Sequence, residues 1–206
     1  MKIHQLATGS AAALAFALIS AVPAQAQFGI GAGLNFNDLD DVDTSSGSAT
    51  FDESTGYHFG LFVNIGSGPV SLRPGVFYHR TGTYDFPAGE ELDLSAIEVP
   101  IDIRLDFAPD SPVSVYVLGA PVITFPSAGE GDFKDAFEKI ALSADIGAGI
   151  ALELPGGGLT LMPELRYSAG ITDYWSDDFS VGGVTVSPID AARRVSKWMV
   201  RLNVMF

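Results

Sequence analysis

The sequence predicts an all-β protein, an eight-stranded antiparallel up-and-down transmembrane β-barrel with a filled polar lumen. Three observations predict it. Apolar and polar residues alternate with a period of two in eight stretches, short and long connections alternate along the chain, and one face of the stretches carries no charge. No segment after residue 26 shows sustained apolar residues at helical spacing. Strands are therefore expected throughout the domain.

The first 26 residues have the features of a secretory signal peptide. Lys2 gives a basic start, residues 11–22 form an apolar run, and Ala24-Gln25-Ala26 fits a signal-peptidase site. The run is too short to span a bilayer as a helix, so we expect it to be removed. The expected organisation is a signal peptide over residues 1–26 and one outer-membrane β-barrel domain over residues 27–206. The chain has no cysteine, which excludes disulfides, thiolate metal sites and a lipid anchor on cysteine.

Eight segments show the period-two alternation expected of strands. They are residues 28–36, 57–65, 70–80, 94–107, 113–125, 141–154, 159–171 and 196–206.

The connections between these segments alternate in length. GSGP (residues 66–69), APDSP (108–112) and PGGG (155–158) are tight turns, whereas the other four connections are long and rich in Asp, Ser and Gly. In an up-and-down barrel this order places all short turns at one rim and all long loops at the other, as in bacterial outer-membrane barrels.

Aromatic residues are predicted to form two girdles, one at each rim. A soluble barrel has no reason for two belts, but aromatic rings favour both lipid–water interfaces of a membrane. A strand of about 11 residues, tilted ~40°, spans roughly 28 Å, close to the apolar band of an outer membrane. The predicted girdle residues are Phe28, Phe107 and Phe206 at the short-turn rim and Phe36, Tyr57, Tyr78, Tyr167 and Trp198 at the long-loop rim.

The acidity of the chain is concentrated at the long-loop rim. The four long connections contain 18 of the 25 acidic residues and four of the 11 basic residues. The first loop, NDLDDVDTSSGSATFDE, lacks the D-x-D-x-D-G spacing of an EF-hand. A solvated acidic loop is the favoured interpretation, and loose association with divalent cations, including cations that bridge to surface lipid phosphates, is the alternative.

The inward face carries charges of both signs. An eight-stranded barrel is just wide enough for its inward side chains to pack, and unpaired buried charges are costly, so these groups should pair across the lumen. A sieve-like porin is therefore disfavoured. The predicted lumen charge network comprises Arg73, Glu98, Asp102, Arg104, Asp145, Glu164, Arg166 and Arg201.

Three segments, FGIGAGLNFNDL, YHFGLFVNIGSGPVSLRPGVFYHRTG and LSAIEVPIDIRLDF, resemble the small outer-membrane β-barrel domain family that includes PorT-like proteins. The resemblance covers nearly all of the mature chain. It implies the barrel fold and localisation in the cell outer membrane, and the family has no shared catalytic residues to transfer.

Two further motifs admit a catalytic or binding interpretation. GIGAG at residues 29–33 resembles a nucleotide-binding loop, but such a loop needs a helix behind it, and none follows here. The favoured interpretation is therefore structural: these glycines face inward and make room for larger side chains across the lumen. His58 and His79 are expected to point inward near the long-loop rim, where outer-membrane hydrolases use histidine. No Ser-His-acid arrangement is evident, so catalytic and metal sites are predicted to be absent, as are cofactors.

The last predicted strand, SKWMVRLNVMF (residues 196–206), indicates how the barrel closes. It should pair with the first strand, and Phe206 resembles the C-terminal aromatic signal read by the barrel assembly machinery. We expect a non-enzymatic, monomeric membrane protein that is structural or interacts through its acidic loops. The expected partners are outer-membrane lipids, the assembly machinery and a possible surface ligand, without nucleic acid. A narrow channel and a lipid- or peptide-modifying hydrolase are the alternatives.

Overall fold

A computed structural model describes residues 26–38, 42–44, 47–49, 55–66, 68–85, 91–128, 138–156, 158–173, 179–181, 184–186 and 194–206 of the chain. The predicted signal peptide lies outside these residues, apart from Ala26. Most of the four long connections also lies outside them, so the expectations about acidic-loop binding and calcium concern residues that are not described.

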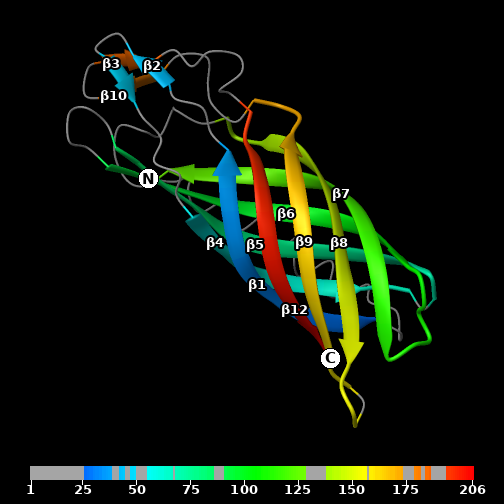
Figure 1. The fold of residues 1–206 in the computed structure, drawn as a ribbon. Helices are drawn as coiled ribbons and strands as arrows, with labels where there is room; N and C mark the ends of the chain where they lie inside the picture. Colours follow the sequence, from blue (N-terminus) through cyan, green and yellow to red (C-terminus); the bar gives the residue numbers. More distant parts are fainter. Residues whose placement is uncertain are drawn as a thin grey trace, which may run out of the picture.

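Eight strands form one closed barrel in the order β1-β12-β9-β8-β7-β6-β5-β4 (Figure 1). Every neighbouring pair is antiparallel. The barrel strands are β1 (Gln27–Asp38), β4 (Thr55–Asn64), β5 (Val70–Asp85), β6 (Glu91–Asp106), β7 (Val113–Ala128), β8 (Ala141–Glu153), β9 (Thr160–Gly170) and β12 (Ser196–Met205). The predicted fold class and all eight predicted strands are confirmed.

Four three-residue strands that the sequence did not predict form a separate sheet, in the order β10-β11-β2-β3. They are β2 (Val42–Thr44), β3 (Gly47–Ala49), β10 (Phe179–Val181) and β11 (Val184–Val186). They belong to the first and last long connections. Three residues are too few to give a detectable period-two pattern.

The last strand closes the barrel on the first. β1 and β12 pair from Gly29↔Met205 to Asp38↔Ser196. The backbone N–H of Phe206 continues the ladder and donates to the Phe28 carbonyl at 2.8 Å. No edge of the barrel is left open, because β1 pairs with β4 on its other side.

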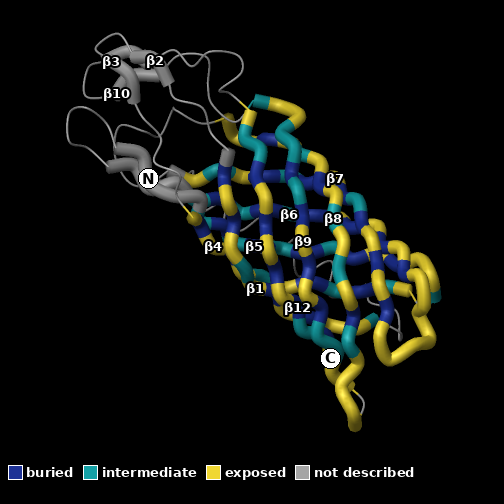
Figure 2. Tube along the Cα trace, viewed as in Figure 1, coloured by how far each residue is buried: buried dark blue, intermediate teal, exposed yellow. Residues whose placement is uncertain are grey.

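The period-two alternation is visible as alternating burial along each strand (Figure 2). In β12 the inward set, which includes Lys197, Arg201 and Asn203, is buried, while Trp198, Val200 and Leu202 are exposed. A slip of one residue in register would exchange the two sets. Among the described residues, no helix is long and apolar enough to cross a membrane.

Prolines interrupt the hydrogen-bond ladder without opening the barrel. The β5–β6 pairing skips from Pro74↔Ile101 to Phe77↔Glu98, and the β6–β7 pairing skips from Pro100↔Val122 to Ile103↔Gly119, beside Pro121. The β8–β9 pairing is likewise interrupted next to Pro163. Each proline lacks an N–H donor, so the sheet breaks locally where that donor would face a neighbour.

Candidate functional site

The centre of the lumen holds a buried network of ion pairs. Arg166 Nη1 donates to Asp102 Oδ1 at 3.0 Å, and Arg166 Nη2 donates to Asp102 Oδ2 at 2.5 Å. Arg166 also contacts Glu164 through Nε and Asp145 at 3.5 Å. Arg73 on β5 bridges two carboxylates, since it donates to Asp102 Oδ2 at 2.9 Å and to Glu164 Oε2 at 2.6 Å. These contacts join β5, β6, β8 and β9 across the barrel.

The network is buried and multiply hydrogen-bonded. The side chains of Arg166 and Glu164 have no exposed surface, and Arg73 and Asp102 are also buried. The hydroxyl of Tyr116 on β7 adds a further bond to Glu164 Oε2 at 2.9 Å. Charges buried to this degree are tolerated only when they are paired and hydrogen-bonded.

A second group lies nearer the long-loop rim. Lys197 Nζ pairs with Glu98 Oε1 and lies 3.4 Å from His79 Nδ1, while His79 Nε2 is 3.1 Å from Glu98 Oε2. The rings of His58 and His79 are stacked, with centroids 4.8 Å apart and planes 14° from parallel. The structure thus brings the two predicted inward histidines together, with the ammonium of Lys197 beside them.

Arg201 connects the second group to the aromatic residues of the lumen. Its Nε donates to His58 Nε2 at 3.1 Å, and its guanidinium lies 3.9 Å from the centroid of the Phe77 ring. Arg201 faces Glu164 in the strand register, yet among the described residues it forms no salt bridge. The cation is stabilised by a ring face and an imidazole nitrogen.

Arg104 belongs to a third group, towards the short-turn rim. It pairs with Asp106 on its own strand, and its guanidinium stacks at 4.1 Å over Tyr116. Glu98, Asp102 and Asp106 occupy the same face of β6 at intervals of four residues, roughly 13 Å. The predicted charge residues are all buried, but they divide into three groups at three heights.

The lumen also contains an apolar cluster that sequence analysis did not place there. Its members are Phe62, Phe77, Tyr116, Leu118, Ala151, Met162 and Met205. Glycines opposite the rings make room for them. A Cβ on Gly29 would lie 2.1 Å from Phe62 Cζ, and one on Gly149 would lie 2.4 Å from the Tyr116 hydroxyl. This packing role agrees with the structural interpretation of GIGAG, since residues 29–33 lie within strand β1.

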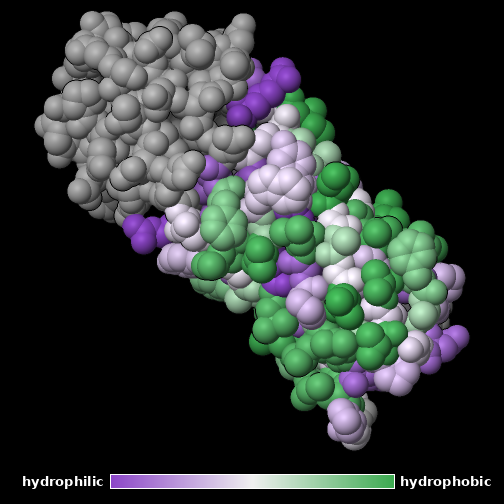
Figure 3. All heavy atoms as spheres, in the orientation of Figure 1, coloured by the Kyte–Doolittle hydropathy of each residue, from purple (hydrophilic) through white to green (hydrophobic). Residues whose placement is uncertain are grey.

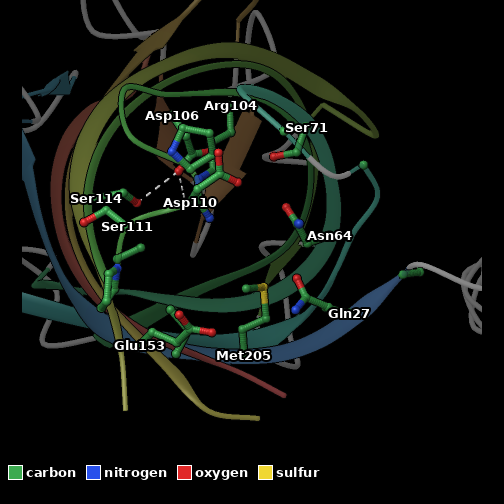
Figure 4. A pocket seen from close by; sticks show the side chains of 17 residues that line it. Gln27, Asn64, Ser71, Arg104, Asp106, Asp110, Ser111, Ser114, Glu153 and Met205 are labelled. Carbon is green, nitrogen blue, oxygen red and sulfur yellow. Dashed lines mark hydrogen bonds and ion pairs between the residues drawn. The ribbon is translucent and has the colours of Figure 1, made fainter. Parts of the chain in front are cut away.

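At the short-turn end the lumen opens into a cavity of about 530 Å³ (Figure 4). Polar side chains line it, including Gln27, Asn64, Ser71, Ser114 and Glu153. The Ser114 hydroxyl donates to Asp106 Oδ1 at 3.4 Å. Arg104 also lines the cavity, as do Ala151 and Met205 of the apolar cluster.

The outer face of the barrel is largely apolar in the view of Figure 3. Six of the eight predicted girdle residues are exposed, and the other two, Tyr78 and Tyr167, are half-buried. Phe36, Trp198 and Tyr167 are consecutive cross-strand neighbours on β1, β12 and β9. The rings of Tyr167 and Trp198 are 4.9 Å apart, and those of Tyr57 and Tyr78 are 6.5 Å apart. At the other end, Phe28, Phe107 and Phe206 are exposed at the short-turn rim.

Within the described part of the chain, no group of three or more His, Asp or Glu side chains is arranged to hold a metal ion. The polar contacts of the two histidines there are with Arg201, Lys197 and Glu98.

A closed eight-stranded barrel with an apolar, aromatic-girdled exterior and a charged, filled interior defines a small integral outer-membrane β-barrel protein. Residues 8–185 match the model of the outer membrane protein beta-barrel domain, and the chain belongs to that family. It is therefore a protein of the cell outer membrane, as predicted.

Solved structures show the same fold. Neisserial surface protein A is 17% identical with a TM-score of 0.51, and the match covers 87% of this chain and 97% of that one. OprG from Pseudomonas aeruginosa is 13% identical with a TM-score of 0.51, covering 87% of this chain and 95% of that one. A comparison with curated protein sequences finds no significant match.

Proposed function

We propose that this protein is a non-enzymatic outer-membrane barrel, closed to solutes, that acts structurally or through its acidic external loops. The observation that carries the proposal is the ion-pair network of Arg73, Asp102, Glu164 and Arg166, which links opposite walls in the middle of the lumen. Opening a solute path there would separate these charges from their partners, at a cost of several kcal/mol. Single-channel recording in planar bilayers tests the proposal, and we expect no conductance steps.

The contacts of the histidine pair support the non-enzymatic part of the proposal. Acyl transfer requires a nucleophile within hydrogen-bond reach of the base, and the described contacts of His58 and His79 are with two cations and Glu98. We expect cells that carry wild-type protein and cells that carry the His58→Asn/His79→Asn variant to have identical lipid profiles by mass spectrometry. A modified lipid present only with the wild type would contradict the proposal and favour the hydrolase alternative.

We propose that Phe206 is the signal by which the barrel assembly machinery recognises β12. Its side chain is 53% exposed at the short-turn rim, and its N–H continues the ladder to β1. Deleting Phe206 is expected to lower the folded, heat-modifiable fraction in cells severalfold while leaving refolding from urea into lipid vesicles unchanged.

Phe107 provides the matched control for Phe206. It is also a phenylalanine at the short-turn rim and is 65% exposed, but it lies in a turn between strands. Phe107→Ala should leave assembly in cells near the wild-type level. If Phe107→Ala and the Phe206 deletion reduce assembly equally, Phe206 acts only as an interface residue.

A further inference from the structure

The cavity at the short-turn end combines unpaired acids with unsatisfied buried polar atoms. In an outer-membrane barrel this end faces the periplasm. Four charged side chains among the described residues line the cavity, Arg104, Asp106, Asp110 and Glu153, which gives a side-chain charge of −2. In the mature chain expected after removal of residues 1–26, the α-ammonium of Gln27 also lies at this cavity and reduces the net charge to −1. The Arg104–Asp106 pair is internally neutral. Neither Asp110 nor Glu153 has an ion-pair partner within the described part of the chain, so the surplus negative charge lies at the mouth.

Two polar atoms inside the cavity add an independent observation. Ser71 Oγ and Asn64 Oδ1 have no hydrogen-bond partner, although their residues are only 6% and 5% exposed. Both side chains point into the cavity in Figure 4. Both atoms accept hydrogen bonds, and a buried polar atom without a partner costs about 1–3 kcal/mol.

Size and chemistry together define the ligand class. A volume of about 530 Å³ lies within the range of small-molecule sites. The two carboxylates at the mouth and Asn64 Oδ1 are acceptors, Ser71 Oγ can donate or accept, and Arg104 Nε is a buried donor without a partner. A ligand that carries a positive charge satisfies the carboxylates, and donors further along it reach the two oxygens, whereas an anion would be repelled by Asp110 and Glu153.

We propose that this cavity is a periplasm-facing binding site for a small organic cation that carries a primary ammonium group. The ammonium lies between the carboxylates of Asp110 and Glu153, and donors further along the ligand reach Asn64 Oδ1 and Ser71 Oγ. A free polyamine supplies this chemistry. The site goes beyond the proposed function, because it opens on the opposite side of the membrane from the acidic loops.

The test uses the mature barrel refolded in uncharged detergent, with binding followed by amide chemical shifts and calorimetry. The probes are spermidine and cadaverine, with 1,5-pentanediol and glutarate as a neutral and an anionic control. We expect an ammonium probe to shift resonances of Asn64 and Ser71 and to bind more weakly as salt is raised.

Charge-neutralising variants complete the test. Asp110→Asn and Glu153→Gln should each weaken binding about threefold to fivefold, which is the effect of removing one partly exposed charge. Glu138→Gln is the matched control, because Glu138 is an exposed acid at the long-loop end, away from the cavity. The proposal is overturned if neither ammonium probe binds, if pentanediol or glutarate binds as tightly, or if Glu138→Gln weakens binding as much as Glu153→Gln. None of these outcomes bears on whether the lumen conducts solutes.

Discussion

Replacing Arg166 by methionine is expected to destabilise the barrel by about 3–5 kcal/mol, because it removes one of the two arginines that pair with Asp102 and Glu164 and breaks the ion pair of Asp145. Arg166 contacts Asp102, Glu164 and Asp145, and its side chain is 0% exposed. Methionine keeps most of the apolar stem, so the loss reflects charge and hydrogen bonding more than volume. Equilibrium unfolding in urea, with the protein in lipid vesicles, measures the change.

Arg194→Met is the matched control for Arg166→Met. Arg194 also pairs with an aspartate, Asp173, at 3.6 Å, but its side chain is 60% exposed. An exposed pair contributes about 0–1 kcal/mol, so this variant should unfold close to the wild type. Arg166→Lys keeps the charge but loses the two-nitrogen contact with Asp102, and we expect an intermediate loss. Equal losses for Arg166→Met and Arg194→Met would contradict a structural role for the network.

Val200→Arg is expected to destabilise the barrel by about 2–4 kcal/mol, because it places a cation in the middle of the lipid-facing band. Val200 is near the centre of β12 and is 51% exposed on the outer face. Unfolding in urea from vesicles again provides the measurement, and tryptophan fluorescence reports it through Trp198.

Val70→Arg makes the same substitution at a different depth. Val70 is 58% exposed and begins β5 at the short-turn rim. The cost there should be about 0–1 kcal/mol, since the arginine reaches the lipid headgroups. If the two variants are destabilised to the same extent, the height assigned to the membrane along the barrel is wrong.

The barrel and the orientation of its strands were predictable because a period of two leaves a strong local signal. Lys197 and Arg201 alternate with Trp198 and Val200, and a single stretch of sequence is enough to assign the two faces. Strand ends were less predictable. β5 runs to Asp85 and β7 to Ala128, beyond the predicted residues 80 and 125, because polar residues outside the apolar band show no alternation.

The ion pairs were not predictable, because they depend on how strands are staggered around the barrel. Arg73 reaches Glu164, which is four strands away in the barrel order, and the arrangement that allows this includes ladder breaks beside prolines. Arg201 contacts His58 and Phe77 although the sequence offered carboxylates as partners. The inward positions of Phe62, Phe77 and Tyr116 do follow from parity within their strands, and could have been found from it.

The middle of the lumen and its short-turn end differ in whether their polar groups are paired. The ion-pair network in the middle of the lumen joins opposite strands and closes the lumen, whereas the short-turn end leaves polar groups without partners in a cavity. A closed centre with one open end suits a protein whose interactions take place at the two membrane surfaces.

Single-channel recording in planar lipid bilayers tests the closed lumen most directly. The mature protein is refolded, its heat-modifiable folded form is purified, and recordings are made at high salt beside a sixteen-stranded porin as a conducting control. We expect no discrete steps from the folded wild type, with the bilayer at its baseline conductance while the porin conducts. Reproducible steps from the folded wild type would contradict the closed lumen and establish the narrow-channel alternative.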